Sequence, residues 1–193
     1  IVVFDGTLEG SGHVVADYHM KGGLIGGLFT LLGRNARVIR IGVDGFHIEG
    51  SGGGLADTNF GGIQQCFAKG IIAGNGTSGG LVGLNYGEIR DCYSQGDVSG
   101  DMTVGGAVGI TSNGYGGGRC LNLYSTASVT GEGKDVGGGR VYKRIGGLIG
   151  DCGVDKGLVE GSFYLFQPDV GEVGGGEPLT DDEMKQPASF IGW

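Results

Sequence analysis

The sequence predicts an all-β fold, a right-handed parallel β-solenoid of about five to six coils of about 26 residues each, with a short helical cap at the C-terminal end. Three observations carry this prediction: an excess of glycine, double glycines that recur at a fixed spacing, and short apolar segments between them. The first is that 48 of the 193 residues are glycine. With only 3 prolines and no glycine at every third position, the composition does not match collagen.

The remaining composition narrows the class of protein further. Hydrophobic residues make up 39% of the chain, too many for a disordered segment. Thirteen Lys and Arg face 21 Asp and Glu, so the net charge is −8, which disfavours nucleic acid as a partner. Apolar runs all fall short of the ~18 residues that a membrane span requires. Because the chain begins IVVFDG without a Met or a signal peptide, we interpret it as a mature or excised piece of a longer protein.

The second observation is the repeat. The double glycines that begin at Gly53, Gly79 and Gly105 recur at a constant interval of 26. An earlier pair, Gly26-Gly27, precedes the first of these by 27, and a later pair, Gly146-Gly147, follows the last by 41. Two insertions explain the excess of 15: five residues around 114–118 and ten within 132–144. Insertions of this kind are tolerated at the corners of stacked coils, where they point outward.

The third observation concerns the segments between glycines, which are too short for three helical turns and are rich in β-branched residues, Tyr and Phe. Stacking such segments pairs each strand with its counterpart in the next coil at ~4.8 Å, as in a parallel sheet. Double glycines let backbone layers approach closely. We expect Leu81, Ile89 and Val98 to point inward. Whether Cys92 or Tyr93 does so stays open, because one bulge reverses the alternation.

One stretch, GGLVGLNYGEIRDCYSQGDVSG (79–100), closely resembles the GLUG repeat, named for its Gly-Leu-any-Gly core. FDGTLEGSGHVVADYHM (4–20) is similar to the lead-in coil that flanks such repeats, with Glu9 and Val15 in place of the usual Asp and Ile. LTDDEMKQPASFIGW (179–193) is similar to the segment that closes the array. The resemblance implies a secreted or surface-attached β-solenoid, as in adhesins, and implies no transferable chemistry.

We therefore divide the chain into a parallel β-solenoid over 1–176, with a lead-in coil over 1–21 and repeats over 22–176, and a capping segment over 177–193. Thr180 and Glu183 have the spacing of a capping box that opens a short helix, which Pro187 ends. We expect this helix to cover the last coil and shield its open strand edges.

Candidate chemistry is sparse. The histidines, His13, His19 and His47, form no cluster in the sequence, and the family resemblance gives His13 a structural hydrogen bond. Asp5, Glu9 and Asp17 suggest a glycosidase pair at most, and Asp91 has only Gln65 and Asn122 as neighbours in the flanking coils. The hypothesis of calcium at a corner (Asp97, Asp101 or Asp155) lacks an EF-hand pattern. We expect no catalytic residue, no metal site and no cofactor.

The four cysteines include Cys66 and Cys92 at identical repeat positions. A disulfide between them stays open, but stacked Cβ atoms near ~5 Å are wide for one. We favour a reduced ladder in which Cys120, at the Ile89 position, packs as a small hydrophobe. Cys152 has no obvious partner in the sequence.

An aromatic stripe is the candidate contact site. Phe60 and Tyr86 follow the corner residues Asn59 and Asn85, and Tyr115 falls nearby in the next coil. Such a stripe would suit a glycan or a protein partner, although packing on its own corner loop is the alternative. The basic residues Arg140, Lys143 and Arg144 of the inserted loop form a second candidate surface.

Our leading functional hypothesis is a non-catalytic extracellular or cell-surface scaffold: an adhesin, a matrix component or a self-assembling filament subunit. The second is a carbohydrate-binding module that uses the aromatic stripe, for which we expect coplanar rings that face solvent. A polysaccharide-processing β-helix enzyme is the third. The partners we consider are further copies of the chain, associated end-to-end or laterally, a glycan, or a surface protein, without nucleic acid or a membrane span.

Overall fold

The structure, a computed structural model, describes residues 3–23, 25–114, 117–138, 140–152, 158–171 and 173–189. Its regular structure is almost entirely strand, and within these residues the strand pairs are parallel except for one antiparallel hairpin. The predicted all-β, mainly parallel architecture is confirmed. No helix in the described part of the chain has the length and apolarity needed to cross a bilayer.

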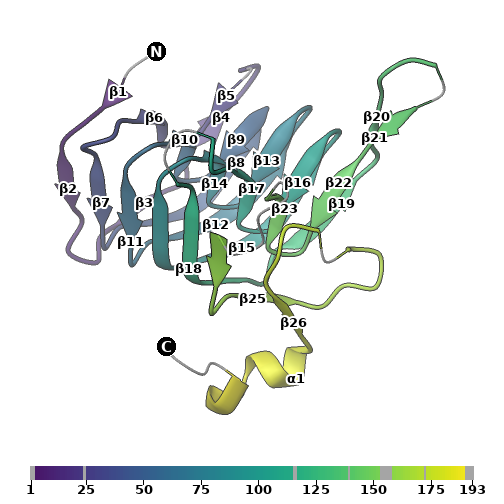
Figure 1. Cartoon of the computed structure of the whole chain (residues 1–193). Coiled ribbons are helices and arrows are strands. Elements are labelled where there is room, and N and C mark those ends of the chain that lie inside the picture. Colours follow the sequence, from purple (N-terminus) through teal and green to yellow (C-terminus); the bar gives the residue numbers. More distant parts are fainter. Residues whose placement is uncertain are drawn as a thin grey trace.

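The chain passes repeatedly through three parallel sheets, and each passage, which we call a coil, lies beside the previous one (Figure 1). Sheet A holds β1 (Val3–Phe4), β6 (Phe29–Leu32), β10 (Ala56–Asn59), β14 (Val82–Asn85), β17 (Val108–Thr111) and β23 (Ile149–Asp151). Sheet C holds β5 (Ile25–Gly26), β9 (Ser51–Gly53), β13 (Thr77–Gly79), β16 (Thr103–Gly105) and β22 (Arg144–Gly146).

Sheet B follows sheet A in each coil and bends part-way along its strands. Its strands are β2 (Thr7–Glu9), β3 (Val14–Ala16), β4 (His19–Met20), β7 (Arg37–Ile39), β8 (Gly42–Glu49), β11 (Gly62–Gln64), β12 (Phe67–Ala73), β15 (Glu88–Gly100), β18 (Arg119–Ser125), β19 (Ser128–Gly131), β24 (Val159–Glu160), β25 (Phe163–Leu165) and β26 (Glu177–Leu179).

The register between coils follows the glycine spacing. In sheet A, Val82 pairs with both Ala56 and Val108, an offset of 26 on either side. The structure aligns the first double glycine, Gly26-Gly27, differently from the sequence comparison. Sheet C pairs Gly26 with Gly52, an offset of 26, and the offset of 27 appears only in sheet A, where Phe29 pairs with Ala56.

Both insertions lie at corners, as predicted. The first falls between β17 and β18, because the offset is 26 at Val82 and Val108 but 31 at Glu88 and Arg119. The second forms the hairpin of β20 (Lys134–Asp135) and β21 (Val141–Tyr142), which projects from the body of the molecule (Figure 1). The coil then resumes at β22, where Arg144 pairs with Thr103.

Glycine brings the backbones of sheets A and C into contact. A Cβ on Gly79 of sheet C would lie 2.2 Å from the carbonyl oxygen of Val82 and 2.3 Å from the nitrogen of Gly109, both in sheet A. From the other side, a Cβ on Gly83 would lie 2.9 Å from the Cα of Gly52 in sheet C. Real Cβ atoms do not tolerate such distances, so Gly79 and Gly83 form a seam where two sheets touch without side chains between them.

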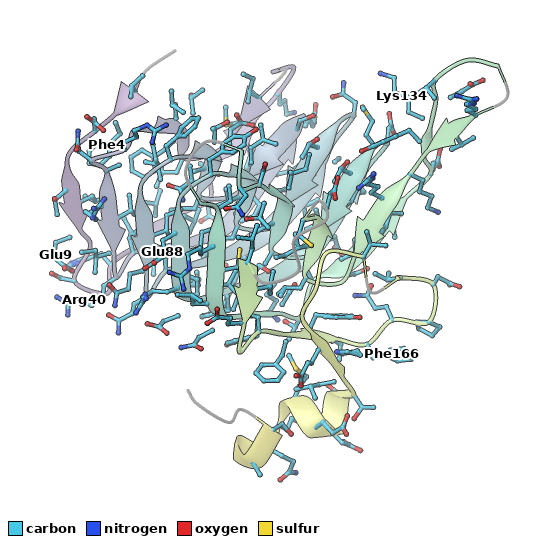
Figure 2. All side chains as sticks on the ribbon, viewed as in Figure 1. Phe4, Glu9, Arg40, Glu88, Lys134 and Phe166 are labelled. Carbon is cyan, nitrogen blue, oxygen red and sulfur yellow. The ribbon has the colours of Figure 1, made fainter. Side chains whose placement is uncertain are left out.

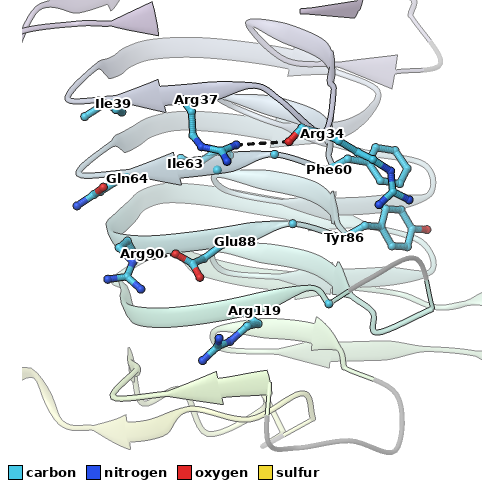
Figure 3. A pocket seen from close by; sticks show the side chains of 14 residues that line it. Arg34, Arg37, Ile39, Phe60, Ile63, Gln64, Tyr86, Glu88, Arg90 and Arg119 are labelled. Atoms are coloured by element: carbon cyan, nitrogen blue, oxygen red, sulfur yellow. Dashed lines mark hydrogen bonds and ion pairs between the residues drawn. The ribbon is translucent and has the colours of Figure 1, made fainter. Parts of the chain in front are cut away.

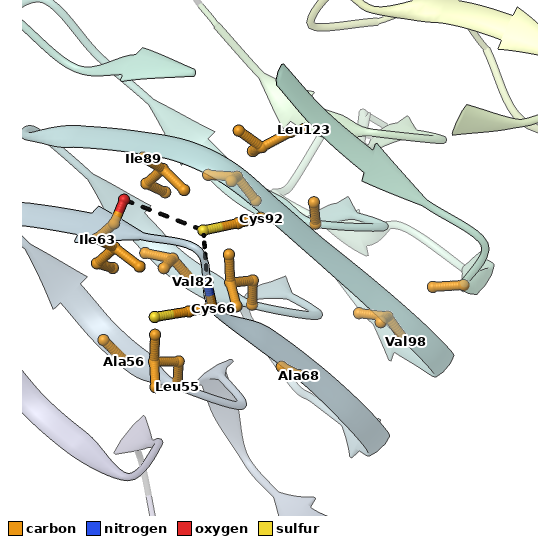
Figure 4. Close-up of a cluster of buried hydrophobic side chains, with 14 of the residues drawn as sticks. Leu55, Ala56, Ile63, Cys66, Ala68, Val82, Ile89, Cys92, Val98 and Leu123 are labelled. Atoms are coloured by element: carbon orange, nitrogen blue, oxygen red, sulfur yellow. Dashed lines mark hydrogen bonds between the residues drawn. The ribbon is translucent and has the colours of Figure 1, made fainter. Parts of the chain in front are cut away.

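The rest of the interior is a stack of apolar columns. Leu81, Ile89 and Val98 are 0%, 0% and 2% exposed, which confirms the predicted inward ladder. The open question about Cys92 and Tyr93 is also answered, since Cys92 is 1% exposed and points inward (Figure 4). Asp91 has a φ of 53°, and this left-handed residue places two outward side chains in succession before Cys92 turns in.

The C-terminal segment departs partly from prediction. The helix α1 (Asp181–Met184) has the expected capping box between Thr180 and Glu183, but it buries none of its residues and so does not cover the last coil. It ends before the 3₁₀ helix of Pro187–Ser189 begins. Instead, β26 pairs with β25 and so covers the open strand edge of the last coil, and Tyr164 packs over Gly147. A helix of four residues is too short to cover this edge.

The close contact between sheets A and C leads to a first prediction. Replacing Gly83 by Ala places a methyl group against the sheet C backbone and should lower the free energy of unfolding by about 1–3 kcal/mol, as overpacking does. Gly6→Ala is the matched control, because its Cβ would meet only the Phe4 ring at 3.8 Å. Urea titrations of both variants measure the difference, and equal stabilities would contradict a steric seam.

A second prediction concerns Asp57, which occupies the column position held by Gly83 and Gly109 in the following coils. Burial raises the pKa of this carboxyl, although it accepts a bond from Thr58 Oγ1 at 2.8 Å. The folded state therefore disfavours the ionised form of Asp57. The resulting loss of stability is complete at neutral pH, and it disappears as the pH falls through the raised pKa of the folded state to below the pKa of the unfolded state. Asp57→Asn should stabilise the protein at pH 7 and lose that advantage near pH 3 in urea titrations; an advantage independent of pH would contradict this cause.

Candidate binding site

The N-terminal carboxylates bond to side chains of the neighbouring coil. Asp5 accepts two bonds of 2.9 Å from Asn35, and these bonds hold the pKa of Asp5 below its ordinary value. Glu9 accepts a 3.0 Å bond from Arg40 Nε, and Figure 2 shows the two side chains together at the first coils. Asp91 accepts a 2.9 Å bond from Asn122, the neighbour the sequence predicted. These carboxylates are used to fasten one coil to the next.

The histidines are placed partly as expected. The His13 ring lies 2.8 Å from the carbonyl oxygen of Gly10, which confirms a structural hydrogen bond. His19 and His47 pair across neighbouring coils, with ring centroids 5.8 Å apart, a contact that was not predicted from the sequence. The repeat spacing hides this neighbour relation, because these first two coils are offset here by 28 residues and not by 26. Across the described residues, no three His, Cys, Asp or Glu side chains converge as a metal site.

All four cysteines are buried free thiols, as the reduced ladder predicted. The Cys66 backbone donates to Cys92 Sγ at 3.3 Å, so the two residues are stacked one coil apart (Figure 4). Burial raises the pKa of Cys92 well above its ordinary value and that of Cys120 to about 12. The Cys92 and Cys120 thiols stay protonated and pack as small apolar groups.

A buried asparagine column forms the corner between sheets A and B. Asn59 Nδ2 donates to Asn85 Oδ1 at 2.9 Å, and Asn85 Nδ2 donates to Thr111 Oγ1 at 3.2 Å. Each asparagine also accepts from a backbone two residues on: Gly61 N at 3.0 Å and Gly87 N at 3.2 Å. This turn geometry sends the intervening residue, Phe60 or Tyr86, outward at a fixed position in each coil.

The rings of Phe60 and Tyr86 stack. Their centroids are 5.0 Å apart with 19° between planes. Rings this close and nearly parallel must overlap face to face, so they differ from the coplanar platform expected of a sugar-binding site. Arg34 lies over Phe60, with its guanidinium carbon 5.9 Å from the ring centroid. Tyr115, the third residue of the predicted stripe, lies outside the described residues.

Beside this stack lies a groove of about 470 Å³ on the first half of sheet B (Figure 3). We call it the arginine groove, because its charged lining residues are Arg34, Arg37, Glu88, Arg90 and Arg119. Phe60 and Tyr86 line one side (Figure 3), and Gly62 contributes only backbone to the lining, with the Arg37 side chain over it. Four cations against one anion make this groove positive in a chain of net charge −8.

Register explains how the cations gather. Arg37, Gly62, Glu88 and Arg119 form one column across four coils, while Gln64 and Arg90 belong to the adjacent column. These arginines were not predicted from the sequence, because neither follows the spacing of 26. Arg37 pairs with Gly62 at an offset of 25 residues, and Arg119 pairs with Glu88 at an offset of 31. The signal was present for Arg119, since allowing for the five-residue insertion aligns it with Glu88.

A second outward column joins Phe67, Tyr93 and Tyr124 on the other half of sheet B. Their centroids are 5.1 and 5.0 Å apart, with 11° and 6° between planes. Lys69 Nζ lies 5.3 Å from the Phe67 centroid and 5.7 Å from that of Tyr93. These rings stabilise the stacking of coils through face-to-face contact.

The other candidate surfaces are weaker. Arg144 of the second candidate surface lies in β22, beside the inserted hairpin, where it forms an ion pair of 2.6 Å with Asp151 and lies over the Tyr142 ring, so its charge is already engaged. Of the proposed calcium ligands, Asp155 lies outside the described residues. The arginine groove is therefore the most distinctive exposed feature of the described surface.

The family model described as the GLUG motif matches residues 74–99. The chain carries a GLUG motif. The matched stretch runs from the corner before β13 through β14 and most of β15, which is one full coil. Neither the curated proteins nor the solved structures gave a match to this chain.

Proposed function

We propose that this chain is a non-catalytic extracellular scaffold, built as a right-handed β-solenoid of about five to six coils, that presents a rigid side surface to other macromolecules. An adhesin, a matrix component or a filament subunit would use such a surface. The GLUG motif supports a repeat scaffold of this kind. The extracellular role rests on the resemblance of the motif to repeats of secreted and surface-attached proteins.

One observation carries the proposal: outward side chains of successive coils bind one another in columns. The Phe60–Tyr86 stack, the Phe67–Tyr93–Tyr124 stack and the bond between Asn122 and Asp91 are three such columns. Their positions are fixed by backbone pairing on both sides. A surface held in this way loses little conformational entropy when a partner binds, which favours a binding role.

The carboxylates support a non-catalytic role in the same manner. General acid–base work needs a carboxylate that can reach a substrate proton. Asp5, Glu9 and Glu88 instead accept bonds from Asn35, Arg40 and Arg90 at 2.9–3.0 Å. Their chemistry is therefore directed at neighbouring side chains of the solenoid.

The proposal predicts binding without turnover. The purified chain, incubated with a panel of polysaccharides and extracellular matrix proteins on beads, should be retained on at least one ligand and release no fragments from any. New reducing ends or peptide ends that grow with time would contradict the non-catalytic role. Light scattering over a concentration series, with negative-stain images, decides the form of the scaffold: filaments would assign self-assembly, and a constant monomer mass would assign contact through the side surface.

A further inference from the structure

We propose that the arginine groove binds an extended acidic segment of a partner protein, in which two Asp or Glu residues stand four positions apart. This inference deepens the scaffold proposal and rests on it, because it names the partner chemistry for the side surface. It follows from charge, donor geometry, ring orientation and spacing.

The charge is segregated against the composition of the chain. Acidic residues outnumber basic ones by 21 to 13, yet the groove holds four arginines and one glutamate. Glu88 is itself bound, since Arg90 Nε donates to its Oε1 at 2.9 Å. The lining therefore carries an excess of positive charge, and such a surface attracts anions.

The cations are arginines, whose donors suit planar anions. A guanidinium carries five N–H donors in a rigid fork that matches a carboxylate. Arg37 uses Nη1 to reach the carbonyl oxygens of Ala36 at 2.8 Å and Arg34 at 3.4 Å, as Figure 3 shows in part. These bonds orient the Arg37 side chain over Gly62 while occupying one of its three nitrogens.

The aromatic stack favours an anionic peptide over a sugar. Pyranose rings bind to exposed aromatic faces, but the faces of Phe60 and Tyr86 are turned toward each other, and Arg34 lies over Phe60. The side of such a stack presents ring edges. Ring edges carry the positive end of the aromatic quadrupole, which attracts carboxylate oxygens and accepts apolar side chains alongside.

Spacing sets the register of the partner. Arg37 and Arg119 occupy one column with Gly62 and Glu88 between them, which is three coil steps or about 14 Å. In an extended peptide, residues i and i+4 face the same side and lie about 13–14 Å apart. Carboxylates at those two positions can reach Arg37 and Arg119 together.

The test is fluorescence anisotropy with the whole chain and a labelled peptide, Gly-Ser-Glu-Thr-Val-Thr-Glu-Ser-Gly. Two control peptides replace both Glu residues by Gln or place them side by side. The inference predicts binding of the first peptide that weakens with added salt, and at least a roughly tenfold loss for each control, since a charge-assisted bond is removed or misplaced.

Matched variants locate the site. Arg37→Gln and Arg119→Gln should each weaken binding roughly tenfold, whereas Arg140→Gln removes the same charge from the hairpin and should leave the affinity unchanged. Unchanged melting temperatures show that the variants are folded. Equal binding of the three peptides, no binding at all, or equal effects of the three variants would overturn the inference.

The same variants also test whether the groove binds a glycan. If an oligogalacturonate or a sulfated oligosaccharide binds more tightly than the peptide and depends on Arg37 and Arg119, the groove is a glycan site and the peptide assignment is wrong. If the peptide does not bind, only the acidic-peptide inference fails. The scaffold role is tested independently, by the retention and fragment-release assay.

Discussion

The close approach of sheets A and C is the constraint on which the rest of this structure depends. At Gly79, Gly83 and their counterparts one coil on, any side chain would collide with the facing backbone, so the two sheets touch directly. This seam fixes where each coil turns. The column of Leu55, Leu81, Ala107 and Leu148 then fills the space beside it, fully buried. A residue gained or lost within a strand reverses the facing of the side chains that follow it, unless a bulge or a corner absorbs the change.

The corner between sheets A and B carries this register to the molecular surface. Asn59 and Asn85 are fully buried, and their amides bond both to the next coil and to their own turns. Buried amides that are satisfied in this way hold one geometry, because any other would leave polar groups unpaired. Phe60 and Tyr86 leave the corner at equivalent positions, and the arginine groove begins beside them. The position of the proposed binding surface is therefore a consequence of interior packing.

Sequence reasoning reached the architecture because glycine spacing is a direct record of the seam. The double glycines at 53, 79 and 105 predicted the register of 26 and located both insertions. It could not orient Tyr93, since the left-handed residue Asp91 reverses the alternation within one strand and nothing local distinguishes it from an ordinary polar residue. It also gave α1 a covering role that β26 performs, because strand pairing across the last edge depends on tertiary contact.

The candidate site was harder to predict than the fold. Phe60 and Tyr86 were found because they follow the corner asparagines. The arginines around them were missed, since offsets of 25 and 31 place Arg37 and Arg119 out of phase with a strict repeat. Charge gathered across coils becomes visible only when irregular registers are known.

The most direct test of this account is to lengthen the array by one repeat. A second copy of residues 80–105, inserted after Gly105, adds one full coil and continues every column. The account predicts that this longer chain folds and melts at or above the temperature of the parent, while a copy shortened by one residue loses cooperative melting. If both insertions melted alike, the register set by the glycine seam would not be what specifies this fold.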